Sequence, residues 1–147
     1  MDDKVKKTTK QIIVGSIIYN VVLFLFSLAF FMIYCYNKKV DLNGGFLLYN
    51  IVKILLGSVV GTIFSIIMII WMAITLNKAV GSNDEKFAKN YIIKNSVFRN
   101  ILFCIILIII INENVLGFNG GIVFILSSLG TKIGAYLTPI IFKQKRI

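Results

Sequence analysis

Four long runs of apolar residues, separated by short polar segments, dominate the pattern of this chain. A helix needs about 20 mostly apolar residues to cross the hydrocarbon core of a bilayer, and the third run reaches that length if it begins near Ile92. Lys94 and Arg99 would then lie at the interface, because long basic side chains extend toward the headgroups. The pattern predicts an all-α membrane protein, a single polytopic domain over residues 1–147 with four transmembrane helices. The expected spans are about 12–36, 47–76, 92–111 and 118–142.

The composition indicates that lipid is the main solvent of the chain. Of its 147 residues, 58% are hydrophobic and 15% are charged, and the mean hydropathy is +0.88. Soluble domains carry about 25% charged residues, which cover their apolar core. We therefore exclude a soluble fold.

Basic residues outnumber acidic ones by 16 to 6, and their distribution predicts the orientation. Lys38, Lys39 and Lys53 fall on one side of the four spans, and Lys132 falls inside the fourth. The other basic residues share the side of both termini: Lys4, Lys6, Lys7, Lys10, Lys78, Lys86, Lys89, Lys94, Arg99, Lys143, Lys145 and Arg146. Because cytoplasmic loops are rich in Lys and Arg, we expect both termini on the cytoplasmic side of the membrane. The membrane is expected to be a bacterial plasma membrane. This arrangement favours anionic lipid headgroups as partners and argues against nucleic acid.

The basic connection 77–98 is expected to be cytoplasmic and partly helical. Ser82-Asn83-Asp84-Glu85 matches the S/T-x-x-E capping box that begins a helix. The helix of the third span would then extend into the cytoplasm. Two interpretations remain open, a helix on the lipid surface or a docking surface for a cytoplasmic partner. The interfacial basic residues concerned are Lys86, Lys89, Lys94 and Arg99.

The supply of reactive side chains is small. The chain has no histidine, and its two cysteines, Cys35 and Cys104, lie far apart. This removes the usual general base, the commonest zinc ligand and any Ser-His-Asp or CxxC arrangement. We expect a non-enzymatic protein with no catalytic residue, no metal and no cofactor.

Two spans carry small residues at every fourth position. Such stripes let helix backbones approach closely, which matters in lipid because association depends on packing rather than on expelling water. They are interpreted either as packing surfaces between the second and fourth spans or as docking surfaces for a partner helix, including a second copy of the chain. The stripes are Gly57, Gly61 and Ser65 in the second span and Gly130, Gly134 and Thr138 in the fourth.

Lys132 is the most informative single residue. It lies about 14 residues into a span of about 25 and thus near mid-depth, where a lysine costs about 2.5–3.5 kcal/mol on insertion scales. Asp41 and Glu113 belong to the expected outer loops, and the other acidic residues to the cytoplasmic side. Lys132 either extends toward the inner headgroups or is neutralised by a charge on another protein.

Residues 46–142 resemble the ATP synthase subunit I family of bacterial F-type ATP synthases. The resemblance lies in the Gly57-x-x-x-Gly61-x-x-x-Ser65 stripe, the basic connection, Arg99 at the start of the third span and Thr131-Lys132 in the last. It implies an accessory role in assembling the ring of c subunits, whose hairpins carry a membrane-embedded carboxylate. On this reading, Lys132 would pair with that carboxylate while the glycine stripes hold the c-subunit helices.

Two other classes of function stay open at this point. A small cation carrier or channel, for magnesium, would need carboxylates or carbonyl-lined breaks within the membrane. A holin-like or regulatory membrane protein would act only by self-association through the glycine stripes.

Overall fold

The computed structural model describes residues 3–38, 44–82, 84–112 and 115–141, and within them every regular element is an α-helix. Lys39, Asp41, Glu113 and the basic residues at 143, 145 and 146 lie outside the described residues. The helices are α1 (Asp3–Lys38), α2 (Gly44–Val80), α3 (Glu85–Ile111), α4 (Gly117–Ser128) and α5 (Gly130–Ile141). The prediction of four segments long and apolar enough to span a membrane is confirmed: Val5–Tyr36, Leu48–Val80, Glu85–Ile111 and Gly117–Thr138.

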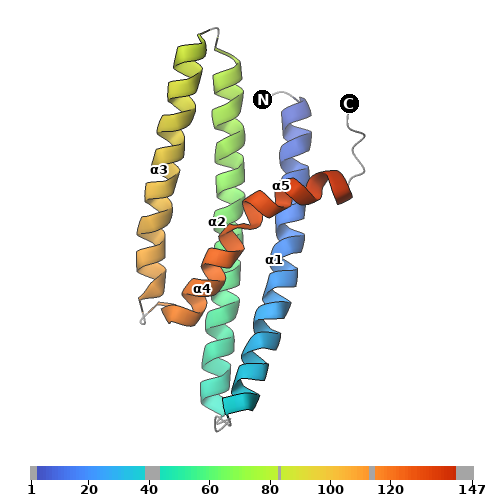
Figure 1. Ribbon diagram of the computed structural model, residues 1–147, viewed down its shortest axis with the longest axis vertical. Helices are drawn as coiled ribbons and strands as arrows, with labels where there is room; N and C mark the ends of the chain where they lie inside the picture. Colours follow the sequence, from blue (N-terminus) through green and yellow to red (C-terminus); the bar gives the residue numbers. More distant parts are fainter. Residues whose placement is uncertain (1–2, 39–43, 83, 113–114, 142–147) are drawn as a thin grey trace.

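The helix α2 is the centre of the bundle. It contacts each of the other four helices, whereas α3 packs only on α2 and α4 among the described elements. The three long helices follow the long axis of the molecule, while α4 crosses α2 obliquely and α5 crosses α1 (Figure 1). The N-terminal end of α1 and the connection between α2 and α3 therefore lie at the same end.

The fourth apolar segment is broken, and the prediction of one continuous helix over 118–142 is wrong. α4 ends at Ser128, and α5 begins at Gly130 in a new direction (Figure 1). The Ser128 hydroxyl donates to the Ile125 carbonyl at 2.7 Å, and the Thr131 hydroxyl donates to the Ser128 carbonyl at 3.2 Å. Hydroxyls that bond to backbone carbonyls in this way often bend helices.

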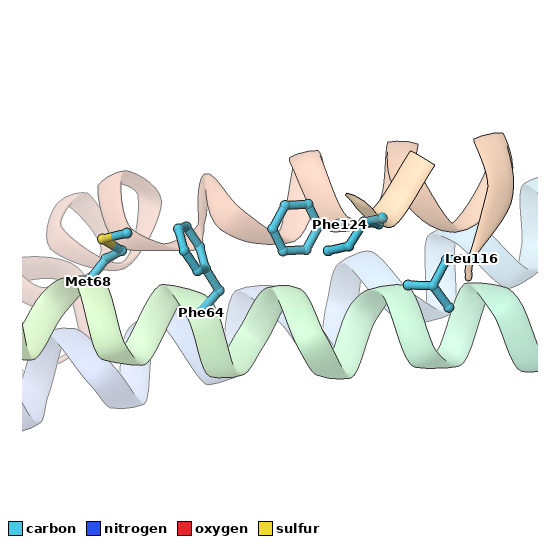
Figure 2. Close-up of a cluster of buried hydrophobic side chains, with 5 residues drawn as sticks. Phe64, Met68, Leu116 and Phe124 are labelled. Atoms are coloured by element: carbon cyan, nitrogen blue, oxygen red, sulfur yellow. The ribbon is translucent and has the colours of Figure 1, made fainter. Parts of the chain in front are cut away.

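The largest apolar cluster lies between α2, α3 and α4. Phe124 is fully buried, and its ring centroid lies 5.6 Å from that of Phe64 and 5.9 Å from that of Phe103. Figure 2 shows Phe64 and Met68 extending from α2 toward the chain that carries Phe124. Leu116 and Ile110 complete the buried cluster. Aromatic pairs at these separations add about 0.5–1.5 kcal/mol each beyond the area they bury.

The connection between α2 and α3 is a short turn. Asp84 caps α3, since its Oδ1 accepts from the Lys86 amide at 2.8 Å and from the Phe87 amide at 3.3 Å. The predicted capping box is therefore wrong in register, because Ser82 donates its hydroxyl to Ala79 and Asp84 carbonyls instead of accepting from an amide. α3 is continuous from Glu85 to Ile111, so the prediction that one helix runs from this turn into the third apolar run is confirmed.

Candidate functional site

The first glycine stripe packs α2 against α4. A Cβ on Gly61 would lie 2.5 Å from the Ser127 Cβ and 3.1 Å from the Phe124 carbonyl oxygen. A Cβ on Gly57 would overlap the carbonyl group of Gly120. Because Gly57 and Gly61 carry no side chain, the backbones of α2 and α4 can approach each other closely.

The second stripe packs α5 against α1. A Cβ on Gly134 would lie 2.8 Å from both the Ile12 carbonyl oxygen and the Ser16 amide nitrogen. Gly130 faces the side chains of Ser16 and Asn20, at 2.8 Å and 2.9 Å from where its Cβ would be. Thr138 completes the stripe within α5, because its hydroxyl donates to the Gly134 carbonyl at 2.8 Å.

The two stripes therefore do not meet each other. Each is covered by a different neighbour within the same chain. The predicted packing between the second and fourth spans is confirmed for the first stripe, whereas the contact of the second stripe with α1 was not predicted. Gly120 lies on α4 opposite the first stripe, and Gly15 lies on α1 opposite the second. That both residues are glycines was the only sign in the sequence that they could be positions of close approach. Spacing does not indicate which pair of glycines will meet. With their backbones covered, the stripes offer no open surface to a partner helix.

Buried hydroxyl and amide groups gather where α1, α2 and the α4–α5 break meet. Ser16 and Ser65 are both 0% exposed, and their hydroxyls lie 3.0 Å apart in a hydrogen bond. Asn20 is 3% exposed and Ser127 is 0% exposed, and their side-chain polar atoms have no hydrogen-bond partner within the described protein. Ser65, the third member of the first stripe, thus links α2 to α1 rather than to α4.

Lys132 lines a cavity of about 700 Å³ formed by α1, α2 and α5. Its neighbours around the cavity include Thr8 and Thr9 from the first turns of α1 and Asn77 from the last turns of α2. Because α5 crosses the bundle instead of running along it (Figure 1), Lys132 shares this cavity with residues from the ends of α1 and α2. Its side chain is exposed, and no salt bridge joins it to a described acidic residue.

The cavity lining is otherwise mostly apolar. Its remaining described residues are Val5, Ile12, Ile69, Met72, Ala73, Leu76, Val80, Thr131, Ala135 and Tyr136. Among the described residues of the lining Lys132 alone is charged, and Tyr136 beside it is 78% exposed. A single cation at the mouth of an apolar cavity favours a partner that carries one negative charge on an apolar body.

The interfacial basic residues lie on the first half of α3. Lys86, Lys89 and Lys94 are exposed, and Arg99 is partly buried. The same half of α3 is fixed to α2, because Phe98 packs on Trp71 with ring centroids 5.6 Å apart and the Trp71 indole donates to the Asn95 side-chain oxygen at 3.3 Å. The lysines are thus held outward by a helix that is fixed to α2.

No protein-family model, no curated protein and no solved structure matches this chain.

Proposed function

We propose that this chain is a non-catalytic, multi-pass accessory protein of the F-type ATP synthase in the bacterial plasma membrane, and that it assists assembly of the c-subunit ring. The observation that carries the proposal is Lys132, an exposed cation at the mouth of an apolar cavity. A charge in this setting is costly alone and cheaper beside a carboxylate. Free c subunits, which carry a carboxylate in the membrane, suit this lysine as clients.

The site of contact differs from the one expected from the glycine stripes. Gly57, Gly61, Gly130 and Gly134 all face backbone or side chains of their own chain, so they support the scaffold rather than hold a client. The client would instead lie across the face of α1, α2 and α5 that opens beside Lys132. The flexible four-carbon stem of the lysine lets its ammonium adjust to the depth of the client carboxylate.

Site-specific photo-crosslinking tests this contact. A photoreactive phenylalanine at position 136 replaces an aromatic side chain that is 78% exposed and lines the cavity. In cells that also express the ATP synthase membrane subunits, we expect adducts with the c subunit. The matched control is position 30, where Phe30 is 74% exposed on α1 and does not line the cavity, and where we expect no such adducts.

Three results, the last of which adds a flux measurement in liposomes, would contradict the proposal. Adducts only between copies of this chain would support a self-associating membrane protein. Equal c-subunit adducts from positions 136 and 30 would indicate random encounter in the membrane. Absence of c-subunit adducts, together with magnesium flux in liposomes that contain only this protein, would support a cation carrier.

A further inference from the structure

The polar residues that line the cavity beside Lys132 gather toward one end, where Val5 and Val80 also line it. α1 and α2 run antiparallel (Figure 1), so Thr8 near the start of α1 and Asn77 near the end of α2 lie at the same end of the cavity. Ile69 and Met72 line it more than one helical turn deeper along α2. The cavity thus has the polarity of an amphipathic molecule with its headgroup toward the N-terminal end of α1.

The charge in the described lining of the cavity is positive, while outside the lining Asp3 pairs with Lys6 at 3.8 Å between Oδ1 and Nζ. No acidic residue belongs to the described lining, in which Lys132 is the charged member. Exposed lysines on the first turns of α1 and the last turn of α2 add positive potential at the same end: Lys6, Lys7, Lys10 and Lys78. Such clusters attract anionic lipids, with about 1 kcal/mol for each basic residue near the membrane surface.

The dimensions favour a lipid over a protein segment inside the cavity. A volume of about 700 Å³ lies within the range of about 300–1,000 Å³ that small-molecule sites occupy. A membrane-spanning helix of about 20 residues, about 10 Å across, cannot enter such a space and would contact only its mouth.

We infer that this cavity is a specific site for one anionic phospholipid. An acyl chain lies against Ile12, Ile69 and Met72, and the headgroup phosphate pairs with the Lys132 ammonium near Thr8 and Asn77. The site neutralises Lys132 while no protein partner is present. It shares Lys132 with the proposed client contact, but its occupancy does not depend on c subunits being the client.

Lipid retention tests the site directly. The protein is purified from nanodiscs that contain phosphatidylglycerol and phosphatidylcholine, and the retained lipids are identified by native mass spectrometry. We expect one phosphatidylglycerol per chain, and about fivefold weaker retention after Lys132→Gln. Lys78→Gln removes the same charge at the same end of the bundle but outside the cavity, so it should lower retention less than Lys132→Gln does. Ala135→Phe keeps the charge and fills the cavity, so it should also lower retention.

Each of the other outcomes overturns the inference. Equal losses from Lys132→Gln and Lys78→Gln would indicate a general attraction to the basic end of the protein. Full retention in Ala135→Phe would show that the lipid lies outside the cavity, and retention of phosphatidylcholine alone would remove the role of charge. Since c subunits are absent from this assay, none of these results bears on ring assembly.

Discussion

Gly134 of α5 and Gly15 of α1 lie backbone to backbone. A Cβ on Gly15 would lie 2.9 Å from the Gly134 carbonyl oxygen and 3.2 Å from its Cα. This contact fixes where α5 crosses α1. It therefore also fixes the position of Lys132, which is two residues before Gly134.

Substitution of Gly134 should weaken the fold. Gly134→Ala forces a methyl group against the backbone of Ile12 and Ser16, and overpacking of this kind costs about 1–3 kcal/mol. We expect the midpoint of SDS-induced unfolding, followed by the fluorescence of Trp71, to fall accordingly. Gly81→Ala is the control, because a Cβ there meets nothing closer than the Asn77 carbonyl oxygen at 3.4 Å. Equal midpoints for the two variants would contradict the described crossing.

The hydrogen bond between Ser16 and Ser65 should be measurable as a coupling. Both hydroxyls are fully buried between α1 and α2, and bonds of this type in membrane proteins average about 0.6 kcal/mol. A double-mutant cycle of Ser16→Ala and Ser65→Ala in the same unfolding assay should give a favourable coupling of that size. Strictly additive losses would show that the two hydroxyls act independently.

Asp84, and not Ser82, should hold the start of α3. Asp84→Ala removes the acceptor for the Lys86 and Phe87 amides, which costs about 1 kcal/mol for a typical N-cap. If this loss of free energy is confined to the start of α3, hydrogen exchange of the two amides should accelerate about fivefold. Ser82→Ala should accelerate this exchange less than Asp84→Ala does. A larger effect from Ser82→Ala would support the capping box that the sequence motif predicts and would contradict the Asp84 cap.

The orientation of the bundle can be tested with single cysteines. The start of α1 and the start of α3 lie at the same end of the molecule (Figure 1), and the basic residues predict that this end is cytoplasmic. In a background with Cys35 and Cys104 replaced by Ala, Lys10→Cys and Lys86→Cys should react with a membrane-impermeant maleimide only after the cells are opened. Labelling of either position in intact cells would contradict this orientation.

The sequence predicts the four apolar helices well because length and hydropathy alone decide whether a segment suits a bilayer. The break at Leu129 could not be predicted in this way, since hydropathy continues through it. It depends on contacts between distant segments, in particular Gly130 against Ser16 and Asn20 of α1. For the same reason, the place of Lys132 beside a cavity lined by α1, α2 and α5 could not be predicted from a straight span.

The candidate site was predictable only in part. Regular spacing identified Gly57, Gly61, Gly130 and Gly134 as positions of close approach, and each does meet a neighbouring helix. Packing of the second span on the fourth was one of the interpretations of the spacing, and Gly57 and Gly61 confirm it, but the contact of Gly130 and Gly134 with α1 came only from the structure. The cavity beside Lys132 could not be predicted either, because it exists only where α5 turns across α1 and α2.

The most direct test of the proposed function measures c-ring formation. The genes for this chain and for the c subunit of the same organism are co-expressed, and the detergent-resistant ring is quantified on gels. We expect rings with the unaltered protein and with Lys78→Gln, and a marked loss with Lys132→Gln, which lacks the charge that pairs with the c-subunit carboxylate. If Lys132→Gln produced as much ring as the unaltered protein, the proposed role of Lys132 in ring assembly would be wrong.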